Sequence, residues 1–212
     1  EGNVTAIYVS KSPNHILSGK KANVPAPYKY KNDDYHNNAE TPYYSVIIKY
    51  NRNGKVIWKK MMPISEFDDI VETVIVDASN SVYAVGHTEG SIMGEMVKTL
   101  TDWEKKTTEP ANKNIFVVKY DANGNQAWSA QLNKHPELIL SGDEFATSSC
   151  VDKKGNLFIS AYHKIGDKKQ SFIITYDSMG NISNIKIEKD DKFDCIINGL
   201  CLDENDNLYA VG

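Results

Sequence analysis

The side chains able to bind metals or act as acid–base catalysts are few, and their spacing forms no recognised motif. The histidines are His15, His36, His87, His135 and His163. None shows the HxH, HxxxH or HExxH spacing that places two imidazoles on one metal ion. GxSxG, P-loop and GxGxxG sequences are absent as well. The sequence therefore predicts no metal, cofactor or catalytic residue. A ligand or acid–base role for His87 and His163, which both follow a predicted strand, is the alternative.

The cysteines and one acidic run are the other candidates for chemistry. Cys150, Cys195 and Cys201 lack CxxC spacing, so we expect free buried thiols and neither a disulfide framework nor a zinc site. Cys150 and Cys201 stand at the same position of a repeated unit, where we expect each to face a neighbouring unit. The run Asp203–Asn207 resembles a calcium loop but lacks the glycine and terminal glutamate of an EF-hand. A simple turn is the favoured interpretation.

Two sequence units alternate along the chain, and they define the elements that position all other side chains. The first reads YSVIIKYNRNGKVIW, NIFVVKYDANGNQAW and SFIITYDSMGNISN, at 44–58, 114–128 and 171–184. The second reads VETVIVDASNSVYAVG, TSSCVDKKGNLFISA and IINGLCLDENDNLYAVG, at 71–86, 147–161 and 196–212, with a weaker copy at 4–19. Repetition at this scale indicates a modular array.

Each pair of units divides into four short strands joined by turns rich in Asp, Asn and Gly. Strands one and two belong to the second unit, and strands three and four, rich in β-branched and aromatic residues, belong to the first. Four antiparallel strands per repeat are typical of a β-propeller blade. The predicted fold is therefore an all-β propeller, with a β-sandwich as its main rival.

Counting strands gives about three and a half blades within a single partial propeller over 1–212. Blade 1 is predicted at 4–62, blade 2 at 69–132, blade 3 at 147–187 and a half blade at 196–212. Because propellers close with four to eight blades, we expect the missing strands to come from a longer parent chain or from another subunit. The alternative is that the first residues complete the last blade.

The pattern KxDxxGxxxW, followed by a VDxxGNxYxxG element, resembles the bacterial β-propeller repeat known as SBBP. It is also similar to the repeats of quinoprotein-type propellers. The resemblance covers most of the chain, in three good copies and one partial copy, and Asn184 replaces the tryptophan in the third. It implies a propeller fold, and it implies no particular activity because propellers host enzymes, binding modules and scaffolds alike.

Strand order predicts that all long connections lie on one face of the propeller. Two of them are insertions, at 20–42 and 87–113, and a short loop at 163–169 is the equivalent connection in the third blade. The first carries Tyr28, Tyr30 and Tyr35, and the second contains a helical pattern with Trp103. Because aromatic side chains on loops held by a rigid frame suit recognition, we predict that these four residues bind a partner. The alternatives are a solvated, partly disordered first insertion and a second insertion that packs back on the frame.

Composition narrows the class of function. The net charge of −4 favours no nucleic-acid partner, and no apolar run is long enough for membrane insertion. We predict a non-catalytic scaffold that binds a protein or carbohydrate through the long-loop face. The alternatives are a propeller enzyme acting on glycans or small molecules in the central channel, and a structural or sensor domain of a bacterial surface protein. The repeats and low cysteine content favour an extracytoplasmic location.

Overall fold

The computed structural model describes residues 4–10, 44–61, 69–88, 113–132, 142–188 and 196–212. All regular secondary structure in this part of the chain is β-strand. The described residues contain no helix long and apolar enough to span a membrane. The strands are β1 (Val4–Ser10), β2 (Tyr44–Tyr50), β3 (Val56–Met61), β4 (Asp69–Val76), β5 (Val82–Thr88), β6 (Asn114–Tyr120), β7 (Gln126–Gln131), β8 (Asp143–Val151), β9 (Leu157–Ile165), β10 (Lys168–Tyr176), β11 (Ile182–Ile187), β12 (Gly199–Leu202) and β13 (Leu208–Val211).

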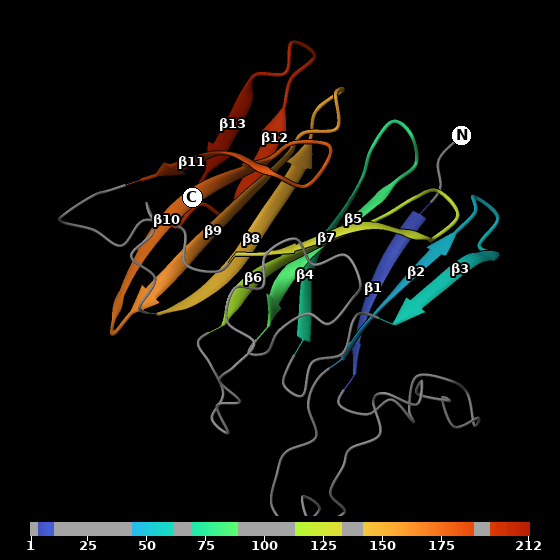
Figure 1. Cartoon of the computed structure of the whole chain (residues 1–212), viewed down its shortest axis with the longest axis horizontal. Coiled ribbons are helices and arrows are strands. Elements are labelled where there is room, and N and C mark those ends of the chain that lie inside the picture. The colour runs from blue at the N-terminus through green and yellow to red at the C-terminus, as the bar shows by residue number, and fades with distance from the viewer. Residues whose placement is uncertain (1–3, 11–43, 62–68, 89–112, 133–141, 189–195) are drawn as a thin grey trace, which may run out of the picture.

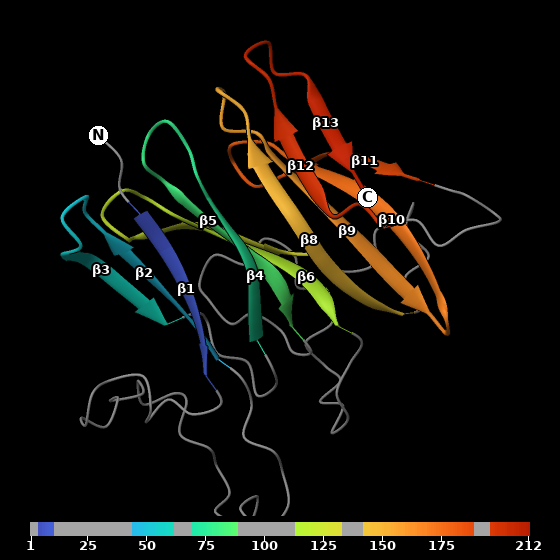
Figure 2. The same cartoon turned by 180° about the vertical axis from the view of Figure 1, so that it is seen from behind.

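These strands form four antiparallel sheets in which spatial order follows chain order (Figure 1). Sheet I contains β1–β3, sheet II contains β4–β7, sheet III contains β8–β11, and hairpin IV contains β12 and β13. The predictions of an all-β fold and of four-stranded antiparallel sheets are thereby confirmed for sheets II and III. Strands β4, β8 and β12, which each begin a sheet or hairpin, contact one another in turn (Figure 2).

The largest core lies between sheets II and III. A sheet that is packed between two others is covered on both faces. Its strands therefore carry β-branched and aromatic residues on both faces, and these residues form the core. Val85, Val117, Ile159 and Ile174 are fully buried there, and Trp128 is only 6% exposed. A second core, built around Ile47 and Trp58, joins sheet I to sheet II.

Six tight turns of one design close the hairpins. The first residue of each is Asp or Asn, and its Oδ1 accepts hydrogen bonds of 2.8–3.0 Å from the amides two and four residues later. Such side-chain bonds replace the strand ladder where the backbone reverses. The first residues are Asn51, Asp77, Asp121, Asp152, Asp177 and Asp203. All six turns lie at one edge of the sheets, which we call the turn edge (Figure 1). The run at Asp203 is therefore a turn of the same kind, as predicted.

The opposite edge, which we call the loop edge, is where β5 ends at Thr88 and β6 begins at Asn114. Here the structure corrects one predicted connection. Residues 163–169 were expected to form a short loop, yet His163 pairs with Gln170 and Ile165 with Lys168. The ladder of β9 and β10 continues to Ile165 and Lys168, since Gly166 and Asp167 suffice to reverse the chain.

The first sheet also differs from the prediction. The copy at 4–19 placed a strand one at Val4–Ser10, but β1 pairs directly with β2 from Val4↔Tyr50 to Ser10↔Tyr44. This is the register of β5 on β6, where Val82 pairs with Tyr120. Val4–Ser10 is therefore a strand two, and that prediction was wrong. The sequence carried the signal, because Gly-Asn precedes Val4 as it precedes Leu157.

A tryptophan latch joins each of the first two sheets to the next. Trp58 Nε1 on β3 donates to Ala122 O in the β6–β7 turn, and Trp128 Nε1 on β7 donates to Ser178 O in the β10–β11 turn, each at 3.1 Å. Ala122 and Ser178 hold the same position in their turns. Because an indole N–H buried without a partner is costly, each bond fixes where one sheet sits on the next.

Candidate functional site

The four residues predicted to bind a partner, Tyr28, Tyr30, Tyr35 and Trp103, lie outside the described residues. The described part of the chain instead offers two groups of polar and aromatic side chains, both at the junction of sheets II and III. One group surrounds a cavity at the turn edge. The other is a cluster of aromatic rings and buried acid–base groups at the loop edge.

The cavity at the turn edge is open and polar, with a volume of about 220 Å³. The turns β4–β5, β8–β9 and β10–β11 form its wall, together with Lys119 from β6. Asp77, Asp152, Lys119, Gly155 and Ser178 are among its lining residues. Acidic, basic and hydroxyl residues all contribute to the lining, so the cavity suits a small polar group better than an apolar one.

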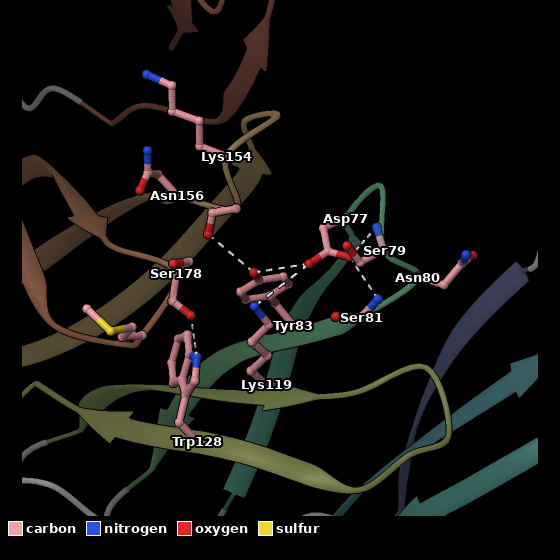
Figure 3. Close-up of polar contacts among 12 residues, drawn as sticks. Asp77, Ser79, Asn80, Ser81, Tyr83, Lys119, Trp128, Lys154, Asn156 and Ser178 are labelled. Carbon is pink, nitrogen blue, oxygen red and sulfur yellow. Dashed lines mark hydrogen bonds and ion pairs between the residues drawn. The ribbon is translucent and has the colours of Figure 1, made fainter.

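Asp77 organises one wall of this cavity (Figure 3). Its Oδ1 accepts the turn amides of Ser79 and Ser81, and its Oδ2 lies 3.3 Å from the Tyr83 hydroxyl and 3.8 Å from Lys119 Nζ. The Tyr83 hydroxyl also lies 3.3 Å from Gly155 O, so its one proton is shared between two acceptors. Burial raises the pKa of Tyr83, and the charge of Asp77 raises it further.

Lys119 completes that network, because its Nζ sits 4.7 Å above the centre of the Tyr83 ring. A cation over an aromatic face gains electrostatic energy from the ring quadrupole. The lysine is therefore held on its own sheet by Asp77 and Tyr83.

At the junction of sheets I and II, the equivalent lysine behaves differently. Lys49 pairs with Trp58 across the strands as Lys119 pairs with Trp128. Its Nζ reaches over to sheet II and donates to Asn80 O at 2.9 Å and to Ala122 O at 3.3 Å. Lys49 is only 1% exposed. Burial lowers the pKa of its ammonium, and the charges of two nearby aspartates oppose that effect.

We expect Lys49→Met to lower the free energy of unfolding by about 1–3 kcal/mol, because two turn carbonyls lose their charged donor inside the junction. Methionine keeps the apolar stem, so packing changes little. Urea unfolding measures the effect, and Lys55→Met, at an exposed position in the neighbouring turn, is the matched control. Equal stability of the two variants would show that the Lys49 bonds contribute nothing net.

The loop-edge cluster is aromatic. The Phe145 and Tyr162 rings stack with their centres 5.2 Å apart, and the His87 ring meets Phe145 edge-on at 5.0 Å. Lys113 and Lys169 each place Nζ within about 5.5 Å of one of the stacked rings, at 5.4 and 5.3 Å. Phe145 and Tyr162 are half-buried while His87 is buried, so this rigid cluster reaches the surface at the loop edge.

Beside this cluster lies a buried acid and a buried imidazole. Glu144 and His163 face each other across β8 and β9, at the register where Asp69 and Thr88 face each other in sheet II. The Thr88 hydroxyl donates to Asp69 Oδ1 at 2.6 Å, whereas Glu144 Oε1 and His163 Nδ1 are buried without a hydrogen-bond partner among the described residues.

Glu144 Oε2 does have a role, since it accepts the amide of Ile115 on sheet II at 3.2 Å. At the other junctions a serine hydroxyl makes the corresponding link: Ser45 Oγ accepts the amide of Val71 at 2.8 Å, and Ser171 Oγ that of Ile197 at 2.9 Å. Ile115 holds the serine position and has no hydroxyl. The glutamate therefore supplies the acceptor from the other side.

Burial shifts the titration of both groups towards their neutral forms. It raises the pKa of Glu144 to about 8, partly offset by the Ile115 amide, and it lowers the pKa of His163. His87 Nδ1 lies 3.3 Å from Glu72 Oε1 but makes no hydrogen bond. His87 on sheet II and His163 on sheet III are thus both buried at the loop edge. The described side chains bring together no group of three metal-ligand residues.

Two of the three cysteines are described, and both thiols are free. Cys150 is buried, which raises its pKa to about 11, as expected for a structural thiol. Cys201 is exposed, so the prediction of burial was wrong for it. Ile75, at the same position of β4, packs into the core between sheets II and III. Beyond hairpin IV, the described chain has no further sheet to cover Cys201 in that way.

Neither the cavity nor the hydrogen bond between Ile115 and Glu144 was predicted from the sequence. The sequence does contain a signal for the cavity, because the position that holds Lys49 and Lys119 holds Thr175 in the third copy. A scan against models of protein families found no match, and a search of curated proteins found none either.

Proposed function

We propose that this chain is part of a β-propeller and serves as a non-catalytic binding scaffold, with sheets I to III and hairpin IV as successive blades. The observation that supports the propeller most directly is the repeated latch, in which Trp58 and Trp128 each bond to the same turn position of the next sheet. An element that recurs between neighbours generates a regular array.

The neighbouring first strands support the same arrangement. Thr73 Oγ1 lies 3.3 Å from Ser149 Oγ, which links β4 to β8, and the Leu200 amide on β12 donates to Ser148 Oγ on β8 at 3.1 Å. Strands two to four then follow in order away from these first strands. In a propeller, first strands line the central channel and the later strands lie further out. The resemblance to SBBP repeats fits this proposal.

The binding surface in this proposal is the loop edge. The turn edge of each sheet consists of short turns whose amides are bonded to their own Asp or Asn side chain. The insertion at 87–113 instead connects strands that meet at the loop edge, where Phe145 and Tyr162 provide a rigid aromatic base. Loops on such a frame are where binding residues concentrate. A protein or a carbohydrate is the expected partner.

Site-specific photo-crosslinking tests the proposal. A photoreactive phenylalanine analogue is placed at Tyr35 or Trp103 on the insertions, and at Arg52 or Asn53 in the β2–β3 turn, on the turn edge, as matched controls. In extract from the source cells, we expect crosslinks to one discrete partner from the insertion positions only. Crosslinks from the turn-edge positions alone would refute a loop-edge binding surface.

A further inference from the structure

The junctions of sheets I–II and II–III have the same arrangement of turn carbonyls, but the groups that contact these carbonyls differ. Asn80 O and Ala122 O at the first junction correspond to Gly155 O and Ser178 O at the second, because the turns are copies of each other. At the first junction an ammonium group, Lys49 Nζ, bonds both carbonyls. At the second junction Gly155 and Ser178 both line the 220 Å³ cavity, and no lysine bonds their carbonyls among the described residues.

The two carbonyls of the second junction retain capacity to accept hydrogen bonds. Ala122 O receives both Trp58 Nε1 and Lys49 Nζ, whereas Ser178 O receives Trp128 Nε1 alone among the described residues. A carbonyl oxygen has two lone pairs. Among the described residues, Gly155 O receives only a shared proton from the Tyr83 hydroxyl.

Lys119 does not take the place of Lys49 because it has a competing partner. Asp77 directly follows β4 in the same sheet. Its Oδ2 lies 3.8 Å from Lys119 Nζ, which sits over the Tyr83 ring. Figure 3 shows the lysine directed to this pair, while Lys154 extends away from Tyr83. Asp77 and Asp152 are both lining residues of the cavity.

We propose that the cavity is a binding site for a primary ammonium group, which donates to Gly155 O and Ser178 O as Lys49 Nζ donates to Asn80 O and Ala122 O. The group comes from a small alkylamine or from a lysine side chain of a partner protein. The proposed recognition elements are carbonyl acceptors near acidic residues, so they favour a cation with N–H bonds over one without them, and the Lys49 contacts provide the model for a primary ammonium. This site lies at the opposite edge from the proposed binding surface and does not depend on it.

Nuclear magnetic resonance titration with n-butylammonium at constant ionic strength tests the site. We expect saturable shifts of the Trp128 indole N–H and of the amides of the β8–β9 and β10–β11 turns. Tetramethylammonium, which has the charge but no N–H, and butyrate should leave these signals unchanged. Equal shifts with tetramethylammonium, or none with n-butylammonium, would overturn the proposal.

Asp77→Asn is the decisive variant. Asparagine preserves the turn, as Asn51 does in the β2–β3 turn, but it releases Lys119, which then competes for the two carbonyls. We expect n-butylammonium to bind at least about tenfold more weakly, because the released Lys119 ammonium occupies the two carbonyls. Lys119→Met in the same background should restore binding. Unchanged affinity in Asp77→Asn would also overturn the proposal.

A second titration, with Nα-acetyl-lysine amide, separates the two sources of the ammonium group. Clearly tighter binding than n-butylammonium indicates that a peptide backbone is recognised as well, and hence a partner protein's lysine. Equal binding indicates a free amine. Both outcomes require the same shifts at Trp128, so the absence of shifts with either probe counts against the site itself.

Discussion

Gly180→Ala should lower the free energy of unfolding by several kcal/mol more than Gly54→Ala, although both glycines hold the same turn position. Their φ angles are +85° and +78°, so the backbone strain of an added Cβ, roughly 1–2 kcal/mol, is common to both. A Cβ at Gly180 would lie 2.7 Å from Trp128 Cδ2, whereas one at Gly54 would meet nothing within 4 Å. The difference therefore reports the Trp128 latch, which must move to admit the methyl group.

Urea unfolding measures this difference. Gly180→Ala and Gly54→Ala are compared first in the natural protein and then in a Trp128→Ala background. Truncating a buried tryptophan itself costs about 3–5 kcal/mol. In that background we expect Gly180→Ala and Gly54→Ala to cost the same, because the ring that makes them different is gone. If they already cost the same in the intact protein, the latch does not hold the turn as described.

In the natural protein we expect the free energy of unfolding to fall as the pH rises from about 4.5 to about 8, and Glu144→Gln should abolish this fall. Burial raises the pKa of this carboxyl from 4.5 to about 8, so the folded state binds a proton that the unfolded state releases. The stabilising effect is therefore fully present below the pKa that Glu144 has in the unfolded state. It is lost as the pH rises through the pKa that Glu144 has in the folded state. Each pH unit in that interval costs about 1.4 kcal/mol, so the total reaches several kcal/mol.

The measurement is the free energy of unfolding at several pH values between 4 and 9 for both proteins. Glutamine matches the neutral acid in shape and keeps an acceptor for the Ile115 amide, so the two curves should meet at low pH and separate above it. His163 has a lowered pKa and acts with the opposite sign, losing stability as the pH falls below 6.5, but it is common to both proteins and cancels in the difference. Parallel curves would mean that Glu144 ionises freely in the folded state.

The strands and turns were readable from the sequence because they depend on local chemistry. Alternating units with β-branched strands, and turns that begin with Asp or Asn, predicted all six turns in their observed places, including the turn at Asp203. Strand ends were less predictable. β9 and β10 continue through the expected loop because cross-strand bonds, rather than side-chain type, stabilise His163 to Lys168.

The site was less predictable because it depends on differences between copies. Lys49 and Lys119 are identical in type and position, yet only one crosses to the next sheet, and the reason is the presence of Asp77 in sheet II. Glu144 likewise matters only because Ile115 lacks the hydroxyl of Ser45 and Ser171. Such relations join residues far apart in the chain, and no local pattern contains them.

The order of strands within each sheet has a consequence for how the chain acquires its structure during synthesis. Every strand pairs with its neighbour in sequence, so a sheet is able to form from one continuous segment as it leaves the ribosome. Trp128, however, docks on a turn about fifty residues further along. Sheets I and II thus each keep one indole exposed until the next sheet has emerged, and translation speed sets how long that interval lasts.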